Sequence, residues 1–135
     1  MSHENVELVR RAIDAFNRRD LTALAEFAHD DFEFVSVLTA VDAEGGTYRG
    51  SVAWTTYFKD MDEAWKEWRV EDPQVLDGGE DRVAGLVRVV GTGRHSNAQV
   101  ELSMGLVYVV RDGKLWRMHS YADAAEALKA VGLNG

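Results

Sequence analysis

The segment AGLVRVVG, from Ala84 to Gly91, places one arginine inside an apolar run. Side chains alternate across a strand, so Arg88 shares a face with Leu86 and Val90, and both faces of the predicted strand are apolar. A guanidinium keeps its charge, so a buried one needs an anion, a hydrogen-bonding cavity or a route to water. In a cavity it could fix a carboxylate or enolate-like oxygen. Arg88 is therefore the first candidate catalytic residue; the alternative is a head group at the rim or paired with an acid.

Two tyrosines could donate a hydroxyl hydrogen bond to a ligand oxygen. Tyr108 follows Leu106 by two residues, so both lie on one face of the strand predicted from Gln99 to Val110. Tyr57 lies on a predicted helix. We take Tyr108 as the second candidate catalytic residue and Tyr57 as a ligand-binding candidate. The alternative is that each ring is part of the core and its hydroxyl bonds to the backbone.

The helix predicted after Ser51 carries an unusually aromatic stripe. Large apolar side chains recur along it at helical spacing, which could form one wall of a site for a flat, apolar molecule. The alternative is that the stripe only seals the core. These candidate ligand-binding residues are Trp54, Tyr57, Phe58, Met61 and Trp65.

The histidines and the absence of cysteine bear on metal and acid–base chemistry. The spacing of the four histidines matches no metal-binding motif, and no cysteine is present to supply a thiolate. We therefore expect no metal and no cofactor. His119 should face outward; a register slip of one residue would turn it inward with Glu101, giving a base and an acid.

The overall charge and hydropathy exclude several partners. A net charge of −8 opposes binding to nucleic acid or anionic lipid. No apolar run reaches the roughly 18 residues that span a bilayer, and the first residues do not resemble a signal peptide. We expect a cytoplasmic protein that binds neither nucleic acid nor membrane.

The order of predicted elements indicates an α+β fold. An amphipathic helix comes first, and Asp20 can cap a short second helix. A strand from Phe32 to Leu38, a loop from Asp42 to Gly50 and the aromatic helix follow. Four meander strands and a final helix follow, and Pro73 marks the first of these strands as an edge or a bulge. This order predicts helices on one face of a mostly antiparallel, curved sheet.

Four segments resemble the nuclear transport factor 2-like superfamily, in particular its polyketide cyclase (SnoaL-like) branch. They are Asn5 to Phe34, Tyr48 to Gly50, Val107 to Met118 and Tyr121 to Leu133. The resemblance implies that residues 1–135 form a single cone-shaped α+β barrel, with a curved sheet wrapped around the N-terminal helices. It also implies a pocket on the concave side and a homodimer through the outer sheet face.

Aligned by these segments, the chain lacks the three functional groups of ketosteroid isomerases, because the corresponding positions hold Ala12, Ser36 and Leu106. None of these side chains can act as a general base, so we reject that activity. The alignment also implies which strand residues face the pocket. These are Phe34, Ser36, Leu38, Ala84, Leu86, Arg88, Val90, Leu102, Met104, Leu106, Tyr108, Trp116, Met118 and Ser120.

The resulting hypothesis is a protein that binds a small, largely apolar molecule with an anionic or carbonyl oxygen. If it is an enzyme, the reaction would be a cofactor-independent cyclisation, isomerisation or dehydration with Arg88 as the electrophile. The alternatives are a non-catalytic ligand-binding or dimerisation module, or a domain whose pocket is filled by its own side chains. A scaffold of this kind carries many functions, so the fold alone does not choose between them.

Overall fold

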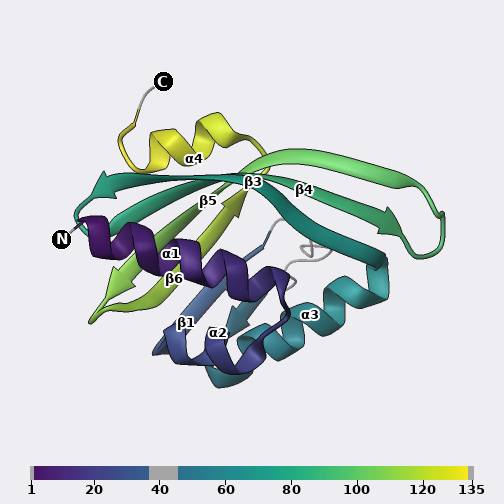
Figure 1. The fold of residues 1–135 in the computed structure, drawn as a ribbon, viewed down its shortest axis with the longest axis horizontal. Coiled ribbons are helices and arrows are strands. Elements are labelled where there is room, and N and C mark those ends of the chain that lie inside the picture. The colour runs from purple at the N-terminus through teal and green to yellow at the C-terminus, as the bar shows by residue number, and fades with distance from the viewer. Residues whose placement is uncertain (1, 37–45, 134–135) are drawn as a thin grey trace.

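The computed structural model describes residues 2–36 and 46–133. Figure 1 shows how the helices and strands of this part of the chain are arranged. Their bounds are Ser2–Asn17 for α1, Leu21–Phe27 for α2, Ala28–Val35 for β1, Thr47–Arg49 for β2, Ala53–Ala64 for α3, Trp65–Gly79 for β3, Arg82–Gly93 for β4, Gln99–Arg111 for β5, Lys114–Tyr121 for β6 and Ala124–Ala130 for α4, with a 3-10 turn at Gly50–Val52.

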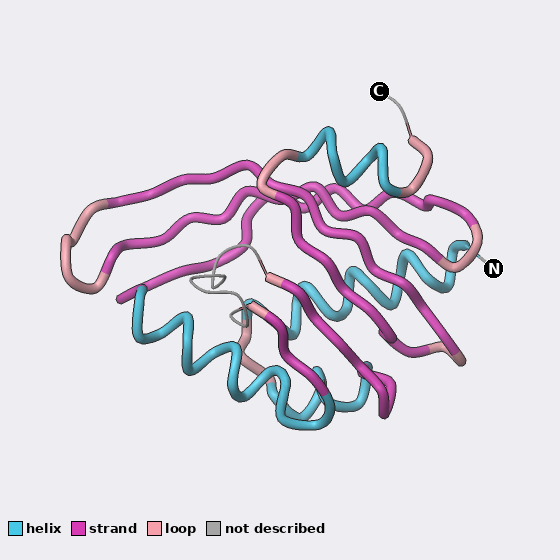
Figure 2. The backbone as a smooth tube through the Cα atoms, turned by 180° about the vertical axis from the view of Figure 1, so that it is seen from behind, coloured by secondary structure: helices cyan, strands magenta, loops and turns pink. Residues whose placement is uncertain are grey.

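The strands form one curved sheet in the order β2-β1-β6-β5-β4-β3. Strands β1 and β6 run parallel, whereas the other neighbouring strands run antiparallel. Seen from behind in Figure 2, the long strands bend along their length. The predicted mostly antiparallel, curved sheet of an α+β fold is therefore confirmed.

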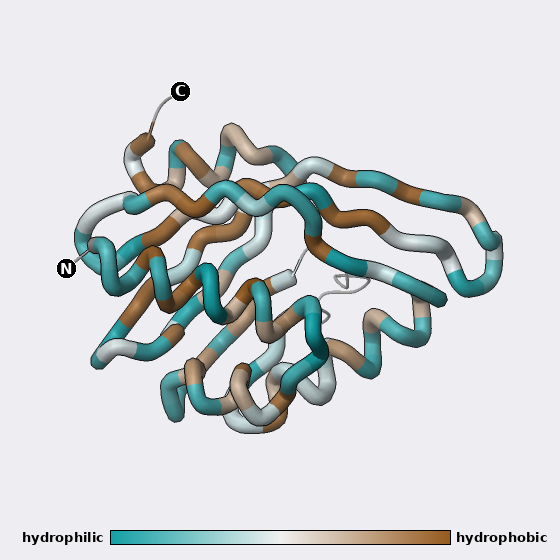
Figure 3. Tube along the Cα trace, in the orientation of Figure 1, coloured by the Kyte–Doolittle hydropathy of each residue, from teal (hydrophilic) through white to brown (hydrophobic). Residues whose placement is uncertain are grey.

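The N-terminal helices lie on the concave side of this sheet. Helix α1 turns its apolar side inward, where Val9, Ala12 and Ile13 are buried. Figure 3 shows the corresponding alternation of hydrophilic and hydrophobic residues along the helix. Helix α2 begins where predicted, because the Asp20 carboxylate accepts a hydrogen bond from the backbone N–H of Ala23 at 3.1 Å.

Helix α4 lies on the other side of the sheet (Figure 1). It packs Ala127 and Val131 against Ala84 of β4 and Val107 of β5. Gly105 allows this close approach, because a Cβ at that position would collide with Ala127. The expectation that all helices pack on one face is therefore wrong for α4, and the apolar outer side of β4 is explained by this helix.

The edge strand β3 contains the irregularity that Pro73 predicts. It ends the sheet, and its pairing with β4 shifts between Glu71 and Gln74. Asp72 in this bulge has a φ of 50°, in the left-handed region. Successive residues of a regular strand point to opposite faces, and the bulge removes this constraint for Glu71 and Asp72.

The largest differences from the predicted elements are at the first strands. Strand β1 begins at Ala28 rather than Phe32, and its expected end at Leu38 lies outside the described residues. Strand β2 falls within the predicted loop and pairs Tyr48 with Phe34. A three-residue strand is too short to give a periodic signal.

Candidate functional site

An interior cavity of about 50 Å³ lies between the N-terminal helices and the concave side of the sheet. A cavity needs roughly 10–15 Å³ of space to hold one water, so this cavity has room for roughly four waters. Most of its wall is apolar, and helices α1 and α3 and strands β1, β3, β4, β5 and β6 contribute to it. The lining residues are Ala12, Ile13, Phe16, Phe34, Ser36, Tyr57, Met61, Trp68, Val70, Val87, Val89, Met104, Leu106, Tyr108, Met118 and Ser120.

The polar side-chain groups of this wall are hydroxyls. They belong to Ser36, Tyr57, Tyr108 and Ser120, each of which is at most 3% exposed. Among the described lining residues there is no acidic, basic or histidine side chain. The cavity can therefore donate and accept neutral hydrogen bonds, but it offers no counter-charge to an ion.

Tyr108 provides the hydroxyl that is available to a ligand. It is 2% exposed, and within residues 2–36 and 46–133 its side chain makes no hydrogen bond. Burial, and to a smaller extent the neighbouring Tyr57, raises the pKa of this phenol far above its usual value, so the group stays a neutral donor. The hydroxyl faces the cavity, where it can donate a hydrogen bond to a ligand oxygen that reaches it.

Gly85 makes room for this ring. On β4 it lies opposite Leu106 and diagonally next to Tyr108, whose own cross-strand partner is Val83. A Cβ at Gly85 would lie 3.1 Å from Cε2 of Tyr108 and 3.7 Å from its hydroxyl oxygen. The missing side chain thus lets the phenol lean over β4.

The second phenol of the cavity, Tyr57, already has a partner. It is buried on α3 and hydrogen-bonds to the side chain of Ser36. Burial raises the pKa of Tyr57 above its usual range despite the opposing effect of that hydrogen bond. The Ser120 hydroxyl bonds weakly to the carbonyl of Val35 at 3.4 Å. Tyr108 therefore differs from these three hydroxyl groups.

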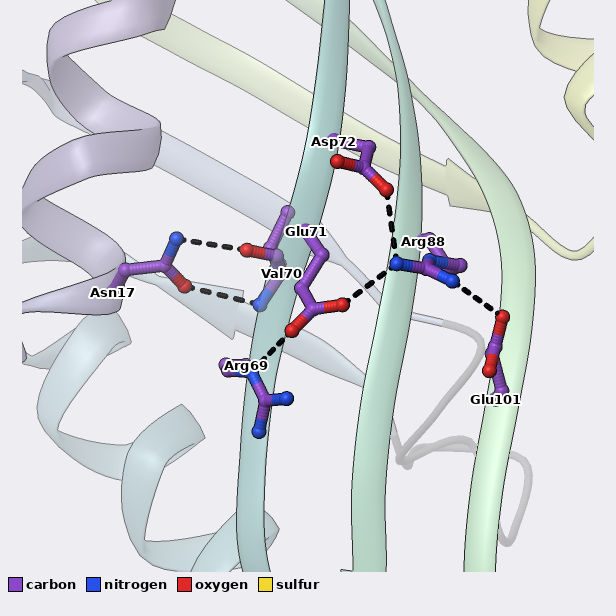
Figure 4. A network of polar contacts seen from close by, with 7 residues as sticks. All are labelled: Asn17, Arg69, Val70, Glu71, Asp72, Arg88 and Glu101. Carbon is purple, nitrogen blue, oxygen red and sulfur yellow. Dashed lines mark hydrogen bonds and ion pairs between the residues drawn. The ribbon is translucent and has the colours of Figure 1, made fainter.

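Arg88 does not lie in the cavity, and its expected placement there is wrong. Its guanidinium donates to Glu101 at 2.7 Å, to Glu71 at 2.8 Å and to Asp72 at 2.9 Å. Figure 4 shows it held between the acids of β3 and the acid of β5, and Glu71 is held in turn by Arg69. The hydrogen bond and charge of Glu101, with the other two charges, raise the pKa of Arg88. The alternative, pairing with acids, is the one the structure shows.

The register between β4 and β5 explains this error. Residues directly opposite each other in a ladder share a face, and Val87 pairs with Met104 whereas Arg88 pairs with Ser103. Because Met104 points into the cavity, Val87 and Val89 do as well, and Leu86 and Val90 lie on the outer face with Arg88. Ala84 also faces outward, against α4. Both faces of β4 are apolar, so hydrophobicity alone could not fix the strand's orientation.

The other predicted site residues divide into two groups. The cavity is lined by Phe34, Ser36, Tyr57, Met61, Met104, Leu106, Tyr108, Met118 and Ser120 and not by Trp54, Phe58, Trp65, Leu102 or Trp116. Leu38 lies outside the described residues. Trp54 stacks on Phe32 with ring centroids 5.4 Å apart, and Phe58 is buried beside Trp68. Trp65 begins β3 instead of ending α3, and its ring lies against Gly91. Trp54 and Phe58 therefore pack in the core and are not part of the wall of the cavity.

The sequence reasoning missed the contribution of the first helix and of β3. Ala12, Ile13 and Phe16 line the cavity from α1, and Trp68 and Val70 line it from β3. The apolar periodicity of the first helix was a usable signal, since a helix on the concave side must turn that stripe inward. In β3 the usable signal was the alternation of Trp68 and Val70, which precede the bulge and pair with Gly91 and Val89 of β4.

No alternative metal or acid–base centre is present in the described residues. No group of three or more metal-ligating side chains occurs there. His119 is exposed and stacks on Tyr121 with ring centroids 4.5 Å apart, so the register slip that would turn it inward does not occur. None of the helices in this part of the chain is long and apolar enough to cross a membrane.

Comparisons with known proteins support this fold. A family model described as a SnoaL-like domain matches residues 9–118. An NTF2-like protein of unknown function from Burkholderia pseudomallei is 21% identical, with a TM-score of 0.78 over 98% of this chain and 99% of that chain. A candidate polyketide cyclase from Xanthomonas campestris is 22% identical, with a TM-score of 0.75 over 97% and 98%.

A third similar structure is that of TerC co-crystallised with polyporic acid, 21% identical with a TM-score of 0.77 over 95% of this chain and 98% of that chain. No match is found among curated proteins. At these identities the solved structures show the fold alone, whereas the family model covers most of the chain. The chain belongs to the SnoaL-like domain family and has the NTF2-like cone fold.

Proposed function

We propose that the protein binds a small, uncharged and largely apolar molecule in the interior cavity, and that Tyr108 donates a hydrogen bond to its carbonyl or hydroxyl oxygen. The observation that carries this proposal is the buried Tyr108 hydroxyl, which lines the cavity and has no hydrogen-bond partner in the described residues. A donor that lines the cavity and is not bonded to the protein is free to bond to a ligand oxygen, which supports a ligand with a carbonyl or hydroxyl group.

The lining favours an uncharged ligand over the anion that a cavity arginine would hold. Arg88 lies on the outer face of the sheet, and the described wall contains no cation. An anionic oxygen would have to leave water without a counter-charge, which is far more costly than burying a carbonyl that accepts one hydrogen bond. We therefore retain the carbonyl part of the initial hypothesis and discard the anionic part.

The similar proteins agree with a carbonyl ligand. The similar protein from Xanthomonas campestris is described as a candidate polyketide cyclase, and polyketides are rich in carbonyl groups. A cyclisation, isomerisation or dehydration would also need a base within hydrogen-bond reach of the substrate. The described wall supplies hydroxyls for binding and no carboxylate or imidazole, so the proposal assigns binding and no proton-transfer step.

The test compares three molecules of similar shape that differ in the group facing Tyr108. Acetophenone offers a neutral acceptor, cumene offers none, and benzoate offers a charged one. We expect acetophenone to bind about twofold to tenfold more tightly than cumene, which corresponds to one neutral hydrogen bond. Benzoate should bind more weakly than both at neutral pH.

The measurement is a two-dimensional amide NMR titration, which gives the dissociation constant and locates the site. Shifts should cluster at Phe34, Met104, Leu106, Tyr108 and Met118, which line the cavity. Benzoate binding as tightly as acetophenone, or shifts confined to the outer face, would contradict the proposal.

The predicted homodimer through the outer sheet face stays a prediction. This face carries the Arg88 network, and α4 already covers its part near Ala84. Light scattering at micromolar concentration would test it, and a mass of one chain would refute it. The predicted cytoplasmic location likewise stays a prediction.

A further inference from the structure

Three methionines meet in the wall of the cavity. Met61 comes from α3, Met104 from β5 and Met118 from β6, and they are 1%, 3% and 6% exposed. They are all the methionines within residues 2–36 and 46–133. We call these three residues the methionine wall.

The methionine wall contains the most adaptable apolar side chains of the lining. Methionine is unbranched with three rotatable side-chain bonds, so it can fill a gap in several ways. Most of the other apolar lining residues are aromatic or β-branched, such as Phe34, Val87 and Val89. Branched and ring side chains have fewer conformations, and a packed interior resists their movement. A change in the size of the cavity would therefore come from the methionines first.

The register places these side chains next to the proposed donor. Met118 is the direct cross-strand partner of Tyr108 between β6 and β5, and it also pairs with Phe34 of β1. Met104 lies on the same face of β5 as Tyr108 and pairs with Val87 of β4. Movement of the Met104 or Met118 side chain would thus enlarge the cavity on the face that carries Tyr108 without disturbing the backbone ladder.

The size of the cavity makes such movement necessary for most ligands. About 50 Å³ is the space of roughly four waters, so a monocyclic ketone already needs some rearrangement of the wall and a bicyclic ketone needs more. We propose that the methionine wall is the specificity-determining element for ligand size, and that it rearranges to admit bicyclic aryl ketones as well as monocyclic ones. This inference rests on the proposed binding function.

The test is a variant in which the wall keeps its volume and loses its adaptability. Leucine has nearly the volume of methionine, and exchanges between the two usually cost less than about 1.5 kcal/mol. The triple variant M61L/M104L/M118L is compared with the unchanged protein for binding of acetophenone and 2-acetonaphthone. Leu115→Met makes the reverse exchange at a buried position of β6 outside the cavity lining and is the matched control.

We expect the unchanged protein and the control to bind both ketones. The triple variant should lose at least tenfold in affinity for 2-acetonaphthone and clearly less for acetophenone, because the larger ketone needs the larger rearrangement. Equal losses for both ketones, no loss for the bicyclic one, or the same loss in the control would overturn the inference. If the unchanged protein binds acetophenone alone, the inference fails and the binding proposal stands; if it binds neither, both fail.

A second measurement needs no variant and decides the question even if the triple variant does not fold. Methionine methyl groups are labelled with 13C, and 2-acetonaphthone is added to the unchanged protein. The methyl resonances of Met61, Met104 and Met118 should shift. Unchanged resonances of the methionine wall at saturation would overturn the inference.

Discussion

Replacing Gly85 by alanine tests the packing that places Tyr108 in the cavity. The new Cβ would lie 3.1 Å from Cε2 of the Tyr108 ring, so the ring would have to give by a few tenths of an ångström. Gly85 does not have a positive φ, so alanine introduces no backbone strain of its own. The cost of the substitution therefore comes from the contact with the ring.

Two opposing effects set the magnitude. Overpacking a well-filled core costs about 1–3 kcal/mol, whereas replacing glycine at a compatible backbone position stabilises by about 0.4–1 kcal/mol through the unfolded chain. The net result should be a loss of about 0.5–2 kcal/mol in the free energy of unfolding. The displaced hydroxyl should also weaken binding of acetophenone.

The assay is urea unfolding of a double-mutant cycle with Tyr108→Leu, which removes the ring atoms that the new Cβ would meet. In that background Gly85→Ala should become stabilising by about 0.4–1 kcal/mol, because the contact is gone and the entropic gain remains. A change of sign between the two backgrounds is the expected result. Equal destabilisation in both backgrounds would refute the reasoning.

Three further predictions follow from the arrangement of the sheet faces and the buried phenols. Arg88→Met should leave the dissociation constant for acetophenone within about twofold in an NMR titration, because Arg88 lies on the outer face; a tenfold loss would be incompatible with that placement. Gly105→Ala should lower stability in urea by about 1–3 kcal/mol, because its methyl would collide with Ala127 of α4, and an unchanged midpoint would argue against this packing. Burial raises the pKa of Tyr57 and Tyr108, so these phenols stay protonated in the folded protein and ionise above about pH 10 in the unfolded chain. The free energy of unfolding should therefore be unaffected by them below this pH and should fall above it. Tyr108→Phe should lose less stability than the unchanged protein between pH 9.5 and pH 11 in urea, and identical losses would contradict this.

The elements of the fold could be predicted because local signals agree with the tertiary structure. Asp20 caps α2, and Pro73 marks both the edge of the sheet and a bulge. The alternation of β5 gave its correct inner face, including Met104 and Tyr108. Each of these signals depends on a few neighbouring residues, so the sequence alone contains it.

The position of Arg88 could not be predicted from the same kind of signal. Strand β4 is covered by the cavity on one side and by α4 on the other, so Val87 and Ala84 are equally apolar for different reasons. The acids that pair with Arg88 lie on the neighbouring strands β3 and β5, far from it in the sequence. Asp72 can reach Arg88 because it lies in the bulge of β3. Only the pairing of β4 with β5 settles which face is inside, and pairing is a long-range property.

The most direct measurement of the central claim is the affinity of Tyr108→Phe for acetophenone and cumene. Tyr48→Phe is the matched control, because the Tyr48 hydroxyl donates to Asp60 at 2.7 Å and Tyr48 does not line the cavity. We predict that Tyr108→Phe binds acetophenone about twofold to tenfold more weakly and cumene unchanged, while Tyr48→Phe binds both as the unchanged protein does. An unchanged affinity of Tyr108→Phe for acetophenone would contradict the claim that this hydroxyl holds the ligand.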